Sequence, residues 1–153
     1  MLWYAAAGLD AELAEQLYDF DAHAPNRPLY PDVLDVLRRL RAARIRLVVL
    51  SDIHLDLRPL LAYHGAADLL DGYVLSCEHG LQKPDPRLFL IGLRTLGTTP
   101  QRTLMVGDLA TNDGGATEVG ITTLILPRVL ARPDRPRLDH LVRLVVPQEA
   151  ATG

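Results

Sequence analysis

The sequence holds one cysteine and no long apolar run, and both features restrict where the protein works. Cys77 has no partner for an internal disulfide, so a reducing cytoplasm is the natural setting. No apolar stretch approaches the roughly 20 residues that a membrane helix needs, and Met1 does not open a signal peptide. We therefore expect a cytoplasmic protein that does not bind membranes.

The sequence also lacks an excess of positive charge. Its formal net charge is -3 at pH 7 and its isoelectric point is about 5.9, which argues against an electrostatic nucleic-acid binder. With 153 residues, 48% of them hydrophobic and 23% charged, the chain is suited to one globular domain with a real core.

Helical and strand patterns alternate along the chain. Residues 47–50 form a continuous apolar run, which is typical of a parallel strand buried on both faces. The alternation predicts an α/β layer fold with a parallel sheet. Helices are expected over residues 10–18, 31–40, 57–64, 86–96 and 112–119, and strands over 47–50, 72–75, 103–106, 122–126 and, at the sheet edge, 144–146. Residues 127–136 are expected to form a loop, and residues 148–153 a flexible tail.

Polar residues directly follow the first strand of the expected sheet. In open parallel sheets, ligands bind beyond the carboxyl ends of the strands. Ser51 and Asp52 lie there, where a hydroxyl and backbone N–H groups can hold an anionic oxygen. The structural alternative is that Ser51 turns the chain and caps the next helix.

A second polar position is Lys83, which precedes a proline in "HGLQKPDP". Proline restricts the preceding residue to extended conformations, so the ammonium group is aimed in a set direction. Such a lysine suits a phosphate or a carboxylate, although a surface lysine in a proline turn is the plainer interpretation. Asp85 is expected to cap the helix that follows.

The third polar position, in "TLMVGDLATND", is the most specific. Gly107 and Asp108 end a strand, and Asp113 lies five residues further on. Carboxylates at the mouth of an α/β sheet are hard oxygen ligands suited to Mg²⁺, and a glycine allows the backbone to approach the ion or a phosphate closely. The alternative is a turn in which one of the aspartates caps a helix.

Taken together and in this order, the three positions resemble the haloacid dehalogenase superfamily of hydrolases. The strings "VVLSDIHLDLRP", "VLSCEHGLQKPDP" and "VGDLATNDGGATEVGITTLIL" are similar to the second, third and fourth motifs of that family. The resemblance covers roughly residues 30–126. It implies a Rossmann-like parallel sheet flanked by helices.

The resemblance also implies a Mg²⁺-dependent phosphatase that acts on a small phosphorylated metabolite through an aspartyl-phosphate. Ser51, Asp52 and Lys83 are then expected to contact substrate, with Ser51, Lys83 and Asp108 as catalytic residues. Asp108 and Asp113 are the expected metal site. This chemistry depends on the electrostatic positioning of a transferring phosphoryl group.

The family's first motif is Asp-x-Asp at the end of the first strand, and its first aspartate is the nucleophile. The stretch "LYDFDAH" places Asp19 and Asp21 at that spacing, but Glu15 and Gln16 before them contradict a buried strand. We interpret this stretch as the end of a helical cap insertion. The expected division is therefore a cap remnant over residues 1–29, an α/β core over 30–147 and a tail over 148–153.

This interpretation leaves the sheet without the family's central strand. The strands that end at Ser51 and Gly107 would then have unpaired edges in the core, which is costly. Either these strands pair directly, or another chain fills the gap, or the sequence is an N-terminally shortened member of the family. We expect the third, and hence a chain of marginal stability and little activity.

Two alternative functions remain open at this stage. A 2-haloacid dehalogenase or phosphonate hydrolase belongs to the same superfamily, although the Gly-Asp pair favours metal and phosphate. A regulatory or scaffolding relative would keep the phosphate pocket without the nucleophile.

Overall fold

A computed structural model describes residues 8–126 and 135–146 of the chain. Helices and four short strands alternate, as the sequence pattern predicts. In chain order the elements are α2 (Ala11–Ala22), η1 (Ala24–Asn26), α3 (Val33–Ala42), β1 (Val48–Ser51), α4 (Arg58–Tyr63), η2 (Ala67–Leu69), β2 (Gly72–Leu75), α5 (Ser76–His79), α6 (Pro86–Leu96), η3 (Pro100–Arg102), β3 (Leu104–Gly107), α7 (Ala110–Asp113), η4 (Gly114–Val119), β4 (Thr122–Ile125) and α8 (Asp139–Val145).

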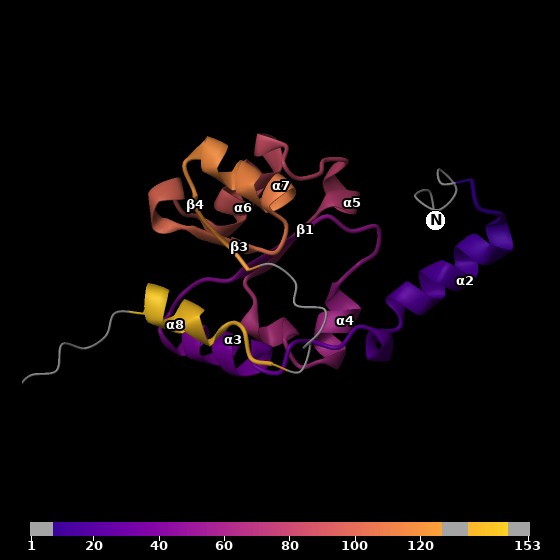
Figure 1. The fold of residues 1–153 in the computed structure, drawn as a ribbon, viewed down its shortest axis with the longest axis horizontal. Helices are drawn as coiled ribbons and strands as arrows, with labels where there is room; N and C mark the ends of the chain where they lie inside the picture. The colour runs from indigo at the N-terminus through magenta and orange to yellow at the C-terminus, as the bar shows by residue number, and fades with distance from the viewer. Residues whose placement is uncertain (1–7, 127–134, 147–153) are drawn as a thin grey trace, which may run out of the picture.

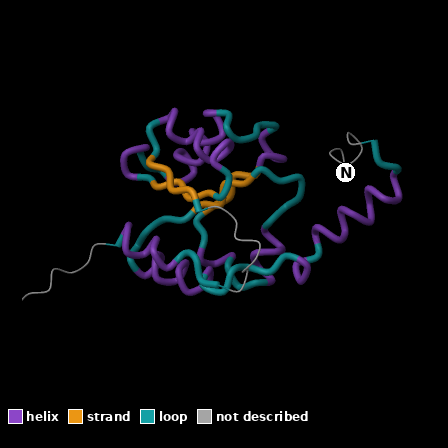
Figure 2. Tube along the Cα trace, in the orientation of Figure 1, coloured by secondary structure: helices purple, strands orange, loops and turns teal. Residues whose placement is uncertain are grey.

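The strands form two parallel pairs. β1 pairs with β2 in a register that joins Val48 to Gly72, and β3 pairs with β4 in a register that joins Leu104 to Thr122. Figure 2 shows the strands together in one layer between two groups of helices. The parallel sheet flanked by helices is confirmed.

α6 packs across both strand pairs. Its residues Phe89 and Leu93 are buried in a cluster that Leu50 of β1 and Met105 of β3 also contact. α7 and η4 lie on the same side of the sheet as α6, whereas α3, α4 and α8 lie on the other (Figure 1). β1 and β3 therefore belong to one layer, even though they are not paired with each other.

β1 and β3 leave a gap between them. The described strands form two separate two-stranded sheets, so β1 and β3 do not pair directly. The apolar residues Val48, Val49 and Leu50 are only half-buried, and so are those of β3. The prediction that residues 47–50 are buried on both faces is therefore wrong for this chain, because no strand of residues 8–126 or 135–146 pairs with the second edge of β1 or of β3.

The stretch "LYDFDAH" forms the end of the N-terminal helix α2 and the residue that follows it. α2 is capped by Asp10, whose carboxylate accepts a hydrogen bond from the Leu13 N–H at 2.9 Å. Asp19 and Asp21 lie within this helix and not at the end of a strand. α2 projects away from the layered body (Figure 1), so the predicted helix is confirmed and extends to Ala22.

Two sequence predictions need correction. Residues 144–146 do not form an edge strand, because Leu144 and Val145 belong to α8, where Leu141 and Val142 are buried and the cluster of α3 and α8 also includes Val145. The helix expected over residues 112–119 is divided into α7 and the 3₁₀ helix η4. Most of the expected loop over residues 127–136, and the tail over 148–153, lie outside the described residues.

Within residues 8–126 and 135–146, none of the helices combines the length and apolar character needed to cross a membrane.

Candidate active site

Of the five site residues expected from the sequence, four come together at one cavity, and Asp52 is not among the residues that line it. Its volume is about 310 Å³, and Ser51, Lys83, Asp108 and Asp113 all line it. Ser51 ends β1, Asp108 follows β3, and Lys83 lies in the loop before α6. The cavity therefore lies beyond the carboxyl ends of two parallel strands, where such sheets bind ligands.

The centre of the site is an ion pair between Lys83 and Asp113. The Nζ of Lys83 lies 2.5 Å from Oδ1 of Asp113, and the two side chains are 11% and 2% exposed. Oδ2 of Asp113 accepts hydrogen bonds from the backbone N–H groups of Asp108 and Leu109, each at 2.9 Å. Both oxygens of Asp113 are thus used to fix the lysine and the turn after β3.

Burial disfavours the charged form of Asp113 and acts to raise its pKa. The hydrogen bond from Lys83 and those from the N–H groups of Leu109 and Asp108 outweigh burial, so the pKa of Asp113 lies below its usual value. Asp113 is therefore a carboxylate at neutral pH and fixes the ammonium of Lys83 in place.

Gly107 allows this arrangement by close approach. A Cβ atom built at Gly107 would lie 2.1 Å from Cγ and 2.2 Å from Oδ2 of Asp113, so any larger residue would occupy the space of that carboxylate. The glycine of the Gly-Asp pair is thus required for Asp113 to reach back under the end of β3.

Asp52 connects the loop of Lys83 to α7. Its Oδ1 accepts a hydrogen bond from the backbone N–H of Lys83 at 2.9 Å, and its Oδ2 accepts one from Nδ2 of Asn112 at 3.2 Å. Asp52 therefore positions Lys83 from the backbone side, while Asp113 positions it from the ammonium side. Asp85 caps α6, as expected, by accepting a hydrogen bond from the Arg87 N–H.

Three residues of the site are missing from the sequence interpretation: Asn112, Tyr30 and Arg137. Tyr30 and Arg137 line the cavity, and the guanidinium of Arg137 lies 4.9 Å from the centre of the Tyr30 ring. Asp32 accepts hydrogen bonds from the backbone N–H groups of Arg137 and Leu138, which brings the start of α8 to the cavity. The sequence carries little signal for these contacts, since Arg137 follows a segment read as a loop.

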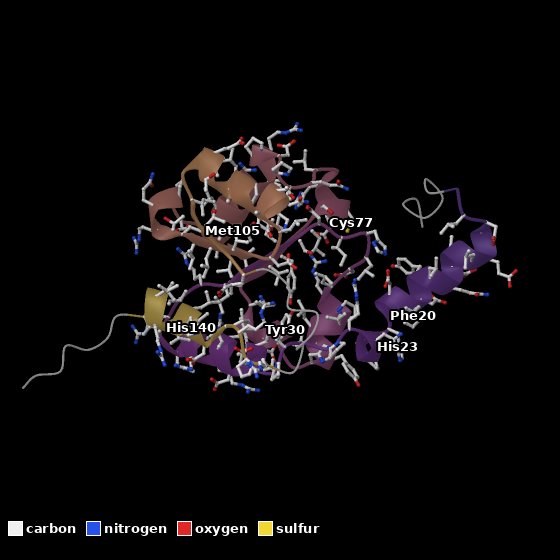
Figure 3. All side chains as sticks on the ribbon, viewed as in Figure 1. Phe20, His23, Tyr30, Cys77, Met105 and His140 are labelled. Carbon is white, nitrogen blue, oxygen red and sulfur yellow. The ribbon has the colours of Figure 1, made fainter. Side chains whose placement is uncertain are left out.

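Asp19 and Asp21 do not line the cavity. Oδ2 of Asp21 lies 3.4 Å from Nε2 of His54, in the loop after β1, and Asp19 is exposed. Burial lowers the pKa of His54 despite the opposing effect of Asp21, so His54 is mostly neutral at pH 7. Figure 3 shows Phe20 of α2, and His23 directly after this helix, well apart from Met105 on β3.

The donor set of the site fits a magnesium ion in part. Mg²⁺ is usually held by one or two carboxylates together with waters and substrate phosphate oxygens. Asp108 suits the role of one such ligand at the cavity wall. Within the described parts of the chain, however, no three His, Cys, Asp or Glu side chains are grouped to hold a metal ion. The described residues therefore fit Mg²⁺ only together with further ligands, such as waters or substrate phosphate oxygens.

Comparison with known protein families decides the class of the protein. The model of the haloacid dehalogenase-like hydrolases matches residues 2–120. The chain belongs to this family. It is 35% identical over 141 residues to a phosphoserine phosphatase of Thermus thermophilus. The aligned region covers 90% of this chain and 56% of the relative.

Other similar proteins agree. A glyceraldehyde 3-phosphate phosphatase of Methanopyrus kandleri is 32% identical over 112 residues, which cover 72% of this chain and 48% of that protein. The solved structure of a HAD phosphatase from Thermococcus onnurineus aligns with a TM-score of 0.76 at 25% identity, over 94% of this chain and 69% of that one. This chain spans about half the length of the curated relatives it matches.

The matching family model is that of hydrolases, and the two curated relatives named above are phosphatases. The predicted superfamily and the hydrolase class are confirmed. Two 2-haloacid dehalogenases are also among its relatives, at 30% and 27% identity.

Proposed function

We propose that this protein is a Mg²⁺-dependent phosphatase that hydrolyses a small phosphate monoester through an aspartyl-phosphate. The observation that carries the proposal is the arrangement of Lys83. A buried carboxylate, Asp113, holds its ammonium group at the wall of a cavity that Ser51 and Asp108 also line. A fixed cation beside a hydroxyl, at the ends of parallel strands, suits a phosphoryl group.

The residues of the site have separate roles in this proposal. The Ser51 hydroxyl donates a hydrogen bond to a phosphoryl oxygen, and Lys83 screens the negative charge of the phosphoryl group. Asp52 holds the backbone of Lys83 in position. Asp108 is a metal ligand, and Asp113 supports the metal site through the backbone of Asp108. When bound, Mg²⁺ would neutralise charge on the transferring group.

The nucleophile comes from outside the described residues. Asp108 and Asp113 are the carboxylates that line the cavity in the described part of the chain, and both oxygens of Asp113 are already used. Residues 1–29, which include Asp19 and Asp21, are in this proposal a cap remnant beside the α/β core of residues 30–147. The setting is the cytoplasm, and the substrate is a small phosphorylated metabolite.

A second candidate is a regulatory relative that binds phosphate without hydrolysing it. The absence of a suitable carboxylate nucleophile among the described cavity residues favours it for the chain acting alone. Dehalogenation is less well supported. The carboxylates of Asp108 and Asp113 lie together at the end of β3, and carboxylate oxygens suit a metal ion that binds phosphate more than a halide.

Calorimetric titration with Mg²⁺ in the presence of inorganic phosphate tests the proposal. We expect Asp108→Asn to weaken Mg²⁺ binding by about 10-fold to 100-fold, because it replaces a carboxylate ligand by a neutral amide. Asp19→Asn is the matched control, since Asp19 is exposed on α2 and away from the cavity, and it should leave binding unchanged. Equal binding by the Asp108→Asn variant, or lost binding in the Asp19→Asn variant, would contradict the assignment.

A further inference from the structure

Arg137 and Tyr30 lie together at the wall of the candidate active site. Both side chains line the cavity of Ser51, Lys83 and Asp108. The Cζ atom of Arg137 lies 4.9 Å from the centre of the Tyr30 ring, within the range of a cation–π contact. The cavity therefore contains a second cation besides Lys83, and this cation comes from a different segment of the chain.

One short turn of the chain fixes Arg137 at two points. Asp32, at the start of α3, accepts hydrogen bonds from the backbone N–H groups of Arg137 and Leu138. Tyr30 lies in the same turn, which is closed by a hydrogen bond from the Val33 N–H to the Tyr30 carbonyl at 3.2 Å. The ring of Tyr30 contacts the guanidinium group. The turn before α3 thus positions both the backbone and the side chain of Arg137.

The packing of α8 does not depend on the guanidinium group of Arg137. α3 and α8 lie side by side (Figure 1), and Leu138 packs against the cluster that contains Val36 and Leu40 of α3. The hydrogen bonds to Asp32 fix the same point through the backbone. The side chain of Arg137 adds a positive charge at the cavity wall, which is a feature that serves a ligand more than the fold.

We propose that Arg137 is a specificity-determining residue, which binds a carboxylate of the substrate while Ser51 and Lys83 bind its phosphoryl group. This inference rests on the proposed function. The substrate is then a phosphate monoester with a carboxylate on a short carbon chain. A cavity of about 310 Å³ is at the small end of the range for ligand sites, which suits a molecule of this size.

A carboxylate suits Arg137 better than a second phosphate. The N–H donors of a guanidinium group lie in its plane, so contact with an aromatic ring through its face does not consume them, and they match the two oxygens of a carboxylate. A second phosphate would bring about two negative charges into a small cavity that the carboxylate of Asp108 also lines. A carboxylate brings one.

Calorimetric titration of the full chain with two small phosphonates, in excess Mg²⁺, tests the proposal. Phosphonoacetate carries a phosphonate and a carboxylate, whereas methylphosphonate carries the phosphonate alone. Blank titrations into the same buffer correct for Mg²⁺ binding by the ligands themselves. We expect the wild-type chain to bind phosphonoacetate at least about 10-fold more tightly than methylphosphonate.

Substitution of Arg137 should remove this preference. We expect Arg137→Gln to weaken phosphonoacetate binding by at least about 10-fold and methylphosphonate binding by less than about 3-fold. Arg137→Lys keeps the charge without the planar fork and should retain part of the preference. Arg143→Gln is the matched control and should change neither ligand, because Arg143 is an exposed arginine of α8 that does not line the cavity.

Tyr30 acts through Arg137 and is a positioning residue in this proposal. Tyr30→Phe keeps the aromatic ring and should keep the preference for phosphonoacetate, whereas Tyr30→Leu should reduce it. A role of Tyr30 in the fold alone would change the binding of both phosphonates equally. Circular dichroism of each variant checks that it is folded.

The outcomes separate this inference from the proposed function. Equal binding of the two phosphonates by the wild-type chain, or a preference that survives Arg137→Gln, would overturn the role of Arg137 and leave the phosphate site in place. Failure of both phosphonates to bind would overturn the proposed function and the inference with it. Tighter binding of methylenebisphosphonate than of phosphonoacetate, lost in the Arg137→Gln variant, would overturn the choice of a carboxylate in favour of a second phosphate.

Discussion

Gly107→Ala should destabilise the protein by at least about 3 kcal/mol, because the new methyl group has no space. Its Cβ would lie 2.1 Å from Cγ of Asp113. Asp113 cannot move aside without losing the hydrogen bonds from Lys83, Asp108 and Leu109. Since the stability of a whole domain is only about 5–15 kcal/mol, the variant loses a large part of it.

Urea denaturation followed by circular dichroism measures this effect. Gly114→Ala is the matched control, because a Cβ at Gly114 meets no atom within 4 Å and its φ of -61° suits alanine. We expect this control to be neutral or more stable by about 0.5 kcal/mol. Similar denaturation midpoints for Gly107→Ala and the wild-type chain would show that Asp113 does not lie under the end of β3.

Lys83→Met should destabilise the protein by about 3 kcal/mol, because it leaves the carboxylate of Asp113 buried without its cation. Asp113 is 1% exposed, so little water can replace the lost partner. Asp113→Asn should have a comparable effect: its carbonyl can still accept from the N–H groups of Asp108 and Leu109, but its amide then faces the ammonium as a second donor.

A double-mutant cycle separates the pair from its surroundings. We expect the double variant to be less destabilised than the sum of the single variants, by about 1–3 kcal/mol, because each single variant leaves one buried group without its partner. Arg87→Met is the control for loss of a cation, since Arg87 pairs with Asp85 at an exposed position. Additive single effects would contradict a direct interaction between Lys83 and Asp113.

The pKa of Asp113 gives this pair a dependence on pH. The folded-state pKa lies below the unfolded value, so the stabilisation is complete above about pH 4 and is lost as the pH falls through the folded pKa. Lys83→Met should therefore flatten the fall of stability on the acid side. The same denaturation series at several pH values tests this.

The sequence identifies the residues at the strand ends because their types and spacing follow from the chemistry. A strand explains the apolar run at residues 47–50, and a fixed ammonium group explains Lys83 before proline. A strand end that an ion or a phosphate can approach explains the Gly-Asp pair at 107 and 108. Their meeting at one cavity follows from the parallel sheet, in which carboxyl ends share one edge. The helix expected over residues 10–18 likewise corresponds to α2.

Other features depend on contacts between segments far apart in the chain. The approach of Arg137 to the cavity depends on Asp32, about a hundred residues earlier, and no local pattern indicates this pairing. α8 forms where a strand is expected over residues 144–146, because Leu141 and Val142 pack on α3. The partial exposure of β1 and β3 goes with the absence of a strand between them among the described residues, which their own apolar residues cannot reveal.

The central claim, that the cavity holds a phosphoryl group against Lys83, can be tested directly, because Lys83 is the one lysine of the sequence. With ζ-¹⁵N-labelled lysine, the protein should give one side-chain ammonium signal in its NMR spectrum. Titration with inorganic phosphate in the presence of Mg²⁺ should shift this signal in a saturable way, whereas sodium chloride at matched ionic strength should not. A signal that does not move with phosphate, or moves equally with chloride, would contradict a phosphate site at the ends of β1 and β3.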